Sequence, residues 1–378
     1  MHTLCDNGAL TGRTSCPAPM ILLPAPSMSA DSTARPIAPA VAPEAAPSEA
    51  SGAHGLADLQ HWGVIQAQGP EAAHFLHQQL TNDLLLLGTP GARLLAYCSA
   101  KGRMLATMVA LKPDAETVLL LLPREVLPAT LKRLSMFVLR AKVKLTDATA
   151  NFRLLGGVGN AVPAALAGPG VPTWAAAATQ QGWAVRLPSS LGLPRALLCQ
   201  PAGVAERAAL PATLPAATWD WLEVRSGVVH IGAALADALV PQMLNYESVG
   251  GVNFKKGCYP GQEVVARSQF RGTLKRRAFV AHSADPLAAG QEVFHSADTE
   301  QPCGVVVAAA ARPDGGWDAV VSMQIAAAEA EGHLYAQSPG DARGAEGTEG
   351  AEGAKPGKEA NAPRLHLLPL PYALLEDI

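Results

Sequence analysis

Apolar positions in the first third of the chain fall into patterns that predict a mixture of strands and helices. An extended segment, Val64–Ala67, precedes a stretch, Pro70–Leu87, whose apolar residues recur at the spacing of one helical face. The other elements predicted here are strands between Leu94 and Leu111 with a hairpin turn at Lys101-Gly102-Arg103, a strand over 117–122 and a helix over 123–139. This order predicts an α+β domain.

The middle of the chain continues the mixture, and the last third changes character. Two strand segments, 145–156 and 183–198, precede a helix over Trp219–Gly227 that Gly227 can end. From Arg276 onward the apolar runs become short and are separated by Gly, Pro and Asp. These runs cover 278–282, 292–294, 304–309 and 317–323, and the apolar segment 364–372 is expected to dock as a last strand. Short, evenly spaced strands predict a small β-barrel.

Two segments have a composition that does not support folding. Residues 1–50 hold 8 Pro and 11 Ala, and residues 339–363 are rich in Gly, Ala and Glu. Such segments bury too little apolar surface to offset the entropy of ordering, so we expect a disordered tail and a disordered insertion. Pro24 and Pro26 interrupt the apolar residues Met20–Leu23, which argues against a secretory signal. No run approaches the ~20 apolar residues of a membrane span.

The overall composition is globular and nearly neutral. Of the 378 residues, 49% are hydrophobic and 16% charged, with a net charge of −3. The whole molecule therefore exerts no strong pull on phosphate backbones or acidic membranes. The six cysteines lie far apart, without the spacing of zinc ligands. This cysteine usage favours a reducing, cytoplasmic setting.

Chemically active residues concentrate in one segment, 250–267. Within it, Tyr259-Pro260-Gly261-Gln262 predicts a type II turn, because Pro fixes φ at the second position and Gly accepts a positive φ at the third. Gln262 and Glu263 then suit the first turn of a helix, whose exposed amides can bind an anion. The turn is expected to present Cys258 beside it.

Positive charge gathers around the same turn. Residues 253–277 carry seven Lys and Arg against one acid, Glu263. Such a patch favours a compact anionic ligand, and nearby cations favour the thiolate form of a cysteine. Cys258 is therefore the leading functional residue. The residues leave open a second interpretation, in which a Gly/Pro segment joins two domains and the cysteine is inert.

The octapeptide Lys256-Gly-Cys-Tyr-Pro-Gly-Gln-Glu263, here called the signature segment, resembles the signature of the YgfZ family of folate-binding iron–sulfur-cluster assembly and repair factors. That family is related in fold to the glycine-cleavage T-protein, an aminomethyltransferase. The flanks 240–245 and 265–267 and shorter elements at 69–72, 75–76, 80–83, 96–99 and 101–103 also resemble the family. The likeness covers roughly residues 56–323 and the last strand.

The resemblance implies an α+β protein with a T-protein-like ring of three domains, two of them α+β folate-binding domains and the third a small C-terminal β-barrel. The expected boundaries are 1–50 for the tail, 51–150 and 151–248 for the α+β domains, and 249–378 for the signature segment and barrel with the insertion 339–363. The implied ligand is tetrahydrofolate or a folate derivative, which offers a flat pteridine and carboxylates that pair with Lys or Arg.

The resemblance also implies residue roles and partners. Cys258 is implied as the redox or cluster-transfer thiol and as a transient metal ligand, while a stable cluster usually needs about four ligands. Folate is implied to bind at Lys256, Gly257, Tyr259, Gly261, Gln262, Glu263 and Arg267. The expected partners are folate and iron–sulfur client or assembly proteins, with no membrane partner.

The chain departs from the T-protein pattern at two places. T-proteins carry paired acids after a Gly-Gly turn, whereas residues 102–107 read Gly-Arg-Met-Leu-Ala-Thr, and Arg225 stands where T-proteins have the glutamate that grips the pteridine. Asp83, Asp220 or Glu223 can still supply an acid. Aminomethyltransferase activity is therefore not expected.

Other constellations carry less chemistry. His74 and His77 are one helical turn apart without further zinc ligands, and Gly156–Gly159 lacks the rest of a dinucleotide-binding fingerprint. His230 or His282 could approach Cys258 as a base. Packing roles are expected for Cys98, Cys199, Cys303, Trp219 and Trp221.

Two further function classes stay open. A folate-dependent one-carbon transferase would produce formaldehyde or methylene-folate from a methylamine. A tRNA-binding or tRNA-modification accessory protein would use the cations of residues 253–277. The acidic remainder of the chain and the lack of interleaved aromatic platforms count against a nucleic-acid partner.

Overall fold

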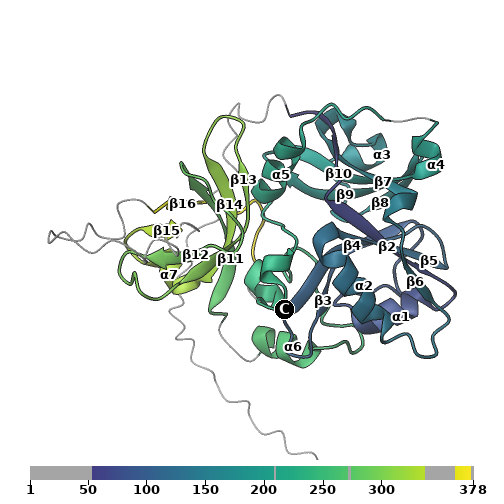
Figure 1. Ribbon diagram of the computed structural model, residues 1–378, viewed down its shortest axis with the longest axis horizontal. Helices are drawn as coiled ribbons and strands as arrows, with labels where there is room; N and C mark the ends of the chain where they lie inside the picture. Colours follow the sequence, from purple (N-terminus) through teal and green to yellow (C-terminus); the bar gives the residue numbers. More distant parts are fainter. Residues whose placement is uncertain (1–52, 208–209, 271–273, 337–361, 376–378) are drawn as a thin grey trace, which may run out of the picture. The chain divides into compact units, whose positions relative to one another are not determined.

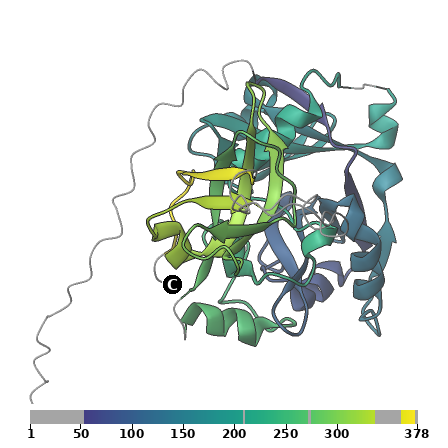
Figure 2. The ribbon, with the colours of Figure 1, turned by 60° about the vertical axis from the view of Figure 1, so that its left-hand side comes forward.

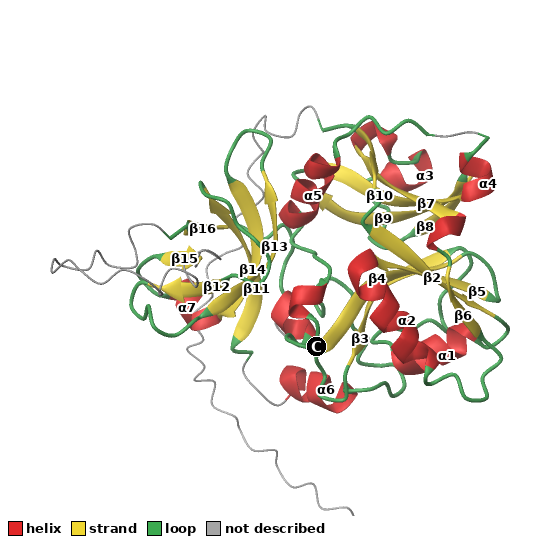
Figure 3. Cartoon of the chain, viewed as in Figure 1, coloured by secondary structure: helices red, strands yellow, loops and turns green. Residues whose placement is uncertain are grey.

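The computed structural model describes residues 53–207, 210–270, 274–336 and 362–375. Their strands form two five-stranded sheets and a closed six-stranded barrel, all within the compact unit 42–378 (Figures 1 and 3). The predicted tail lies outside the described residues, as does the predicted insertion apart from residues 362 and 363. The mixed α+β class and the C-terminal barrel are confirmed, while the expected domain boundaries stay a prediction.

The first sheet is antiparallel throughout, in the order β3-β4-β5-β2-β6. It consists of β2 (Trp62–Gln68), β3 (Gly91–Cys98), β4 (Met104–Lys112), β5 (Thr117–Pro123) and β6 (Lys144–Asp147), with helices α1 (Ala72–Gln79) and α2 (Leu127–Ser135). The predicted strands and the hairpin turn at 101–103 are confirmed. Successive residues of a strand face opposite ways, so Leu95 packs in a core with α1 and α2, whereas Leu94 packs in a larger core with residues of the second sheet.

Both predicted helices of this region are shorter than their apolar spacing indicates. Helix α1 ends at Gln79, not Leu87, because Leu80 is extended (φ −118°, ψ 160°) and Thr81 is held by other elements. The Thr81 hydroxyl donates to the carbonyl of Gly251 (2.7 Å) and accepts the Ala96 N–H (2.8 Å). Helix α2 likewise ends at 135, four residues before the predicted end at 139.

The second sheet has the order β1-β7-β10-β9-β8 and is also antiparallel. Its strands are β1 (Gly55–Asp58), β7 (Phe152–Val158), β8 (Ala176–Thr179), β9 (Gly182–Ser190) and β10 (Leu193–Pro201), accompanied by α3 (Ala164–Ala167), α4 (Ala202–Ala205) and α5 (Ala216–Arg225). The predicted helix before Gly227, which has a φ of +66°, is confirmed. The buried positions of Trp219, Trp221 and Cys199 confirm their predicted packing roles.

The barrel contains every strand that the last third of the sequence predicts. In barrel order the strands are β11 (Arg276–Ser283), β14 (Trp317–Gln324), β13 (Gly304–Ala311), β12 (Glu292–His295), β15 (Leu334–Ala336) and β16 (Arg364–Leu368). Strand β16 pairs with both β15 and β11, which confirms that the last apolar segment docks as a strand (Figure 2). The short helix α7 (Ile325–Glu329) follows β14.

Short helical turns connect these units. They are the 3₁₀ turns η2 (Arg124–Val126), η3 (Thr149–Asn151), η4 (Gly159–Ala161), η5 (Ala233–Leu235) and η6 (Pro241–Leu244), together with helix α6 (Gln262–Phe270). Within the described ranges, no helix combines the length and the apolar character needed to cross a bilayer. Residues 245–261, between η6 and α6, contain most of the signature segment.

Candidate functional site

The signature segment forms the turn that its Pro-Gly pair predicts. The Gln262 N–H donates to the carbonyl of Tyr259 (3.2 Å), and Gly261 has a φ of +80°, as a type II turn requires at its third position. Helix α6 begins directly at Gln262, with Glu263 in its first turn. The predicted turn and helix start are therefore confirmed.

Gly261 fixes the signature segment against the hairpin turn between β3 and β4. A Cβ at Gly261 would lie 2.3 Å from the carbonyl oxygen of Ser99 and 2.7 Å from the Cα of Gly102. Only glycine permits this approach of two backbones. Two segments that separately resemble the same family, the signature segment and Lys101-Gly102-Arg103, are thus in contact.

Lys256 is buried, with its ammonium group at the end of helix α1. Its Nζ donates to the carbonyl of Leu80 (2.8 Å) and to that of His77, and lies 4.8 Å from the centre of the Tyr259 ring. The carbonyls at a helix C-terminus carry partial negative charge, so this is a favourable place for a cation. Burial nevertheless lowers the pKa of Lys256 to about 8, against the opposing charges of Asp83 and Cys258.

Asp83 stabilises the loop that follows helix α1. Its Oδ1 accepts the N–H groups of Leu85 (2.8 Å) and Leu86 (2.9 Å) and lies 3.5 Å from His77 Nδ1. Burial acts to raise the pKa of Asp83, but these amide hydrogen bonds act in the opposite direction, and the resulting pKa is lowered. Asp83 therefore organises the loop after α1, and His77 is a buried packing histidine.

Cys258 presents the one exposed thiol among the four cysteines that the structure describes. Cys98, Cys199 and Cys303 are buried, as predicted, and burial raises the pKa of each, for Cys98 to about 12. A thiol of raised pKa is a poor nucleophile and a poor metal ligand at neutral pH. Exposure therefore singles out Cys258 for chemistry with another molecule.

The remaining residues assigned to the site lie around Cys258 in different environments. Tyr259 is buried, whereas Gly257 is exposed. On helix α6, Glu263 and Arg267 form an exposed ion pair (2.7 Å) with side chains 84% and 63% accessible, and such pairs contribute little to stability. Gln262 is partly buried at the start of the helix.

A pocket of about 480 Å³ opens at the upstream end of the signature segment. Five parts of the chain line it: Asn82, Arg93 from β3, Thr173 with Trp174, residues between Glu247 and Lys255, and Leu375. We call it the Trp174 pocket. It combines two aromatic side chains, Trp174 and Phe254, with the cations Arg93 and Lys255.

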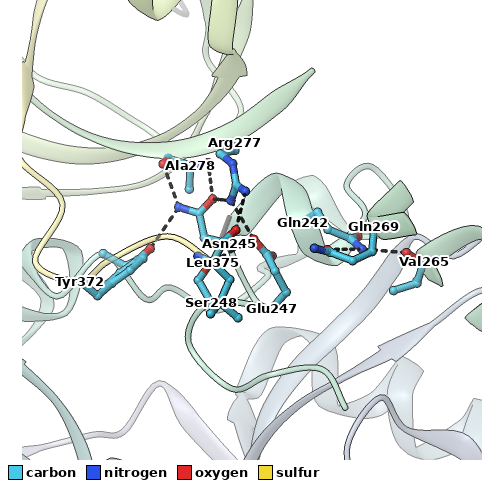
Figure 4. A network of polar contacts seen from close by, with 11 residues as sticks. Gln242, Asn245, Glu247, Ser248, Val265, Gln269, Arg277, Ala278, Tyr372 and Leu375 are labelled. Atoms are coloured by element: carbon cyan, nitrogen blue, oxygen red, sulfur yellow. Dashed lines mark hydrogen bonds and ion pairs between the residues drawn. The ribbon is translucent and has the colours of Figure 1, made fainter. Parts of the chain in front are cut away.

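Glu247 is the buried acid of this pocket. Its Oε1 accepts a hydrogen bond from Arg277 Nη1 (2.7 Å), while its Oε2 is buried without a hydrogen-bond partner among the described residues. Figure 4 shows this pair beside Asn245, whose Nδ2 donates to the carbonyl of Ala278 (3.0 Å) and to the hydroxyl of Tyr372 (3.2 Å). The Glu247 side chain is fully buried, so the pair with Arg277 supports the wall of the pocket and does not present a carboxylate oxygen to its opening.

A second polar group, the Glu223 cluster, is buried between α5, β10 and β4. Glu223 Oε2 accepts the indole N–H of Trp219 (3.0 Å) and lies 3.9 Å from Arg195 Nη2, while its Oε1 lies 3.8 Å from His230 Nε2. His230 Nδ1 is 3.2 Å from the hydroxyl of Thr107. The Arg195 guanidinium stacks over Trp219 at 4.3 Å, and its Nε and Nη2 lack hydrogen-bond partners within the described part of the chain.

Burial controls the charges of this cluster. It raises the pKa of Glu223 to about 7, with Arg195 opposing the shift and Asp220 adding to it. Burial also lowers the pKa of His230 to about 4 and that of Arg195 to about 10. At neutral pH, His230 is therefore neutral and Glu223 can both donate and accept a hydrogen bond.

The sequence left open which of three acids and which of two histidines takes part in a site, and the structure gives each of them a different environment. Glu223 is the acid at the buried cluster, while Asp220 lies 3.6 Å from His61 and Asp83 supports the signature corner. His230 contacts Glu223, and His282 Nδ1 lies 2.9 Å from Asp318 Oδ1 in the barrel. Arg225, which the sequence predicts at the position of the T-protein glutamate, lies 3.5 Å from Asp318.

Sequence reasoning missed Arg195, Arg93 and Trp174. Arg195 had one usable signal, because it is a cation at the start of an otherwise apolar strand, Arg195-Ala-Leu-Leu-Cys199. Arg93 and Trp174 stand in segments without any motif. Within the described residues, no group of three or more His, Cys, Asp or Glu side chains is arranged to hold a metal ion.

Comparison with known proteins gives relatives over most of the chain. No family model matches. A protein of Edwardsiella ictaluri named "tRNA-modifying protein YgfZ" is 33% identical over 273 residues, which is 69% of this chain and 82% of the relative. A protein of the same name from Photorhabdus laumondii is 34% identical over 263 residues, covering 67% and 79%.

A solved structure shows the same fold. The glycine cleavage system aminomethyltransferase T of Bartonella henselae superposes with a TM-score of 0.60 at 18% sequence identity, covering 85% of this chain and 87% of the other. At this identity the likeness concerns the arrangement of the backbone. The T-protein-like fold predicted from the sequence is therefore confirmed.

Proposed function

The chain belongs to the YgfZ family, and on this basis we propose that it is a cytoplasmic factor that binds a reduced folate and assists the assembly or repair of iron–sulfur clusters in client enzymes. In this proposal the folate binds in the Trp174 pocket. Cys258 acts from the adjoining signature segment as the thiol that meets the client. The two sites are close in sequence, since Lys255 lines the pocket and Cys258 is three residues away.

The composition of the Trp174 pocket carries the proposal. Its volume of about 480 Å³ is in the range of ligand sites, roughly 300–1,000 Å³. Trp174 and Phe254 can stack on a flat pteridine. Arg93 and Lys255 suit the carboxylates of the glutamate tail. Bound folate would supply a one-carbon or redox-active pteridine next to the signature segment.

Lys256 has a positioning role in this proposal. Its ammonium group is engaged by the carbonyls of His77 and Leu80, so it holds the signature segment on helix α1. The thiol of Cys258 then stays exposed at a fixed place. A single thiol can serve as a transient iron ligand or redox partner, whereas holding a cluster permanently usually takes about four ligands.

Calorimetric titration with tetrahydrofolate tests the ligand. We expect saturable binding to the wild-type protein and about tenfold weaker binding by Arg93→Gln and by Lys255→Gln, which corresponds to about 1.4 kcal/mol for each lost charge-assisted contact. Lys132→Gln, an exposed cation on α2, is the matched control and should bind as the wild type does. Unchanged affinity in both pocket variants would rule out the Trp174 pocket.

Replacement of the exposed thiol tests the role of Cys258. We expect Cys258→Ala to keep the unfolding free energy and folate affinity of the wild type, yet to lose the activity of iron–sulfur enzymes in cells that depend on this protein. Cys199→Ala controls for loss of a thiol in general, because Cys199 is buried. Full activity of the Cys258→Ala cells would contradict the thiol role.

The name shared by the relatives, tRNA-modifying protein, favours a second candidate, a role in tRNA modification. The cations Lys255, Arg267 and Lys275 lie in or near the signature segment and could contact phosphates. Direct binding of tRNA would show a steep loss of affinity with salt, because each neutralised phosphate releases counterions. Salt-independent or absent tRNA binding, together with folate binding, would favour the first proposal.

A further inference from the structure

The chain continues past the last barrel strand to the Trp174 pocket. Residues 369–375 follow β16 and contain no helix or strand. We call them the strap. Leu375, at the end of the strap, is one of the residues that line the pocket, and it is 40% exposed. One wall of the proposed folate site is therefore supplied by a segment that lies far beyond the signature segment in the sequence.

Tyr372 attaches the middle of the strap firmly. Its hydroxyl donates to the carbonyl of Gly227 (2.9 Å) and accepts a hydrogen bond from Asn245 Nδ2 (3.2 Å). A Cβ on Gly227 would lie 2.9 Å from the Cε1 atom of the Tyr372 ring, so glycine permits this close approach. The ring also packs against the larger core. Packing and two part-buried hydrogen bonds therefore fix Tyr372.

Leu375, three residues further on, is held less firmly. Its N–H donates to Ser248 Oγ (3.1 Å) and its carbonyl accepts from Arg277 Nη2 (3.3 Å), and both hydrogen bonds are exposed to solvent. Exposed backbone hydrogen bonds open at low cost, because water replaces the lost partner. The end of the strap can therefore leave the pocket while Tyr372 stays attached.

The two side chains that hold Leu375 also support the wall of the pocket. Arg277 Nη1 and Ser248 Oγ both donate to Glu247 Oε1, at 2.7 Å and 3.0 Å. Figure 4 shows these residues together with Leu375. Because Glu247 belongs to the lining of the pocket, the position of Leu375 and the shape of the wall depend on the same contacts.

We propose that Leu375 contacts the ligand of the Trp174 pocket and that the bound ligand in turn holds the strap in place. This coupling rests on the folate site proposed above. Leu375 lines the same pocket as the rings of Trp174 and Phe254. A flat ligand packed among these groups removes the exposed leucine side chain from water, which favours the held position of the strap. The coupling is reciprocal, so release of the strap weakens the ligand.

Exchange of the Leu375 amide with water tests the effect of the ligand on the strap. The full chain is labelled with ¹⁵N-leucine, and the Leu375 amide signal is assigned by NMR with Leu375→Ala. We expect saturating tetrahydrofolate to slow the exchange of this amide by about fivefold or more, because the ligand keeps its N–H on Ser248 Oγ.

Calorimetric titration of variants with tetrahydrofolate tests the effect of the strap on the ligand. Leu375→Ala removes the apolar contact, and we expect binding weaker by about fivefold or more. Ser248→Ala keeps all the described lining side chains of the pocket but removes the oxygen that holds the Leu375 N–H. We expect it to weaken binding by about twofold or more and to abolish the slowed exchange. Leu139→Ala, at an 85% exposed leucine after α2, is the matched control and should bind as the wild type does.

The outcomes distinguish the coupling from the folate site itself. Absence of saturable tetrahydrofolate binding by the wild type would overturn both. Saturable binding with an unchanged exchange rate of the Leu375 amide would overturn the coupling and leave the folate site standing. Wild-type affinity in both Leu375→Ala and Ser248→Ala would do the same.

Discussion

Lys256 illustrates how one charged residue organises the signature segment. Its side chain crosses to helix α1, more than 170 positions away in the sequence, and replaces water at two backbone carbonyls. The cost appears in its lowered pKa, because burial disfavours the ammonium form. A lysine held in this way is a structural clamp whose charge is readily lost near pH 8.

Removal of that charge should change the pH dependence of stability. Between pH 8 and 10.5 the unfolded chain still holds the Lys256 proton that the native chain has released, so this group makes stability rise with pH. We expect the wild type to gain about 1–2 kcal/mol relative to Lys256→Met between pH 7.5 and 9.5. Urea unfolding at both pH values measures this difference. The tyrosines and cysteines are the same in both proteins, so their contributions to the pH dependence cancel in the difference. A constant difference would contradict it.

Residue roles were predictable from the sequence only where they depend on neighbours in the chain. The turn at Pro260-Gly261 is local, so its φ values follow from the two residue types. The partners of Lys256 and the place of Arg195 beside Glu223 depend on tertiary contacts between distant strands and helices. No spacing pattern encodes such contacts. The sequence therefore indicated Glu223 and His230 as candidates but not Arg195, the third member of the Glu223 cluster.

At the scale of elements, helix α6 and the β3–β4 hairpin are joined through two glycines. Gly261 at the start of the helix rests on Ser99 and Gly102 of the hairpin, and a Cβ on Gly102 would lie 2.8 Å from the Cβ of Val264 in α6. The exposed Cys258 is therefore carried by a junction between two elements. The stiffness of that junction fixes where the thiol is presented.

Substitution of Gly261 should loosen this junction. Gly261→Ala introduces a Cβ 2.3 Å from a backbone oxygen at a φ of +80°, so we expect a loss of at least about 2 kcal/mol of unfolding free energy. Gly170→Ala, where no atom lies within 4 Å, is the control and should change stability by less than about 1 kcal/mol. Denaturant unfolding measures both, and equal effects would show that the contact is unimportant.

Strands were predicted more accurately than helix ends, for a physical reason. The nearly continuous apolar runs of β3 and β4 reflect burial on both faces, and the partial alternation of barrel strand β11 reflects burial on one face, which the sequence displays directly. The apolar spacing after Gln79 continues into Leu80 and Leu84, both of which are buried without being helical. Side-chain hydrogen bonds of Thr81 override the helical pattern there.

At the scale of the whole molecule, a buried polar junction ties the barrel to helix α5. Asp318 of β14 is fully buried and accepts the indole N–H of Trp221 (2.8 Å), while Arg225 approaches it at 3.5 Å. His282 Nδ1 lies 2.9 Å away on the neighbouring strand. The Asp318 carboxylate thus interacts with polar groups from two parts of the molecule, His282 of the barrel and Trp221 and Arg225 of helix α5.

Loss of this carboxylate should uncouple the barrel. Asp318→Ala leaves Arg225 and the Trp221 N–H without their partner, and we expect a loss of about 3–5 kcal/mol, the usual cost of breaking a buried pair. Differential scanning calorimetry should show the barrel unfolding separately at a lower temperature. Asp314→Ala, whose carboxylate is half exposed, should cost no more than about 1 kcal/mol. A single unshifted transition in Asp318→Ala would contradict the coupling.

The order of strands in the second sheet has a consequence for biosynthesis. Strand β1 (Gly55–Asp58) pairs with β7 (Phe152–Val158), and the entire first sheet lies between them in the chain. At ribosomal speeds of roughly 5–20 residues per second, β1 is translated about 5–20 seconds before its partner. The first sheet can complete its hydrogen bonding during that interval. Its face that bears Leu94 stays exposed until the second sheet forms and packs against it. The nascent chain therefore passes through a stage with one finished sheet and an exposed apolar surface, at which chaperones that act on nascent chains have their best opportunity to bind.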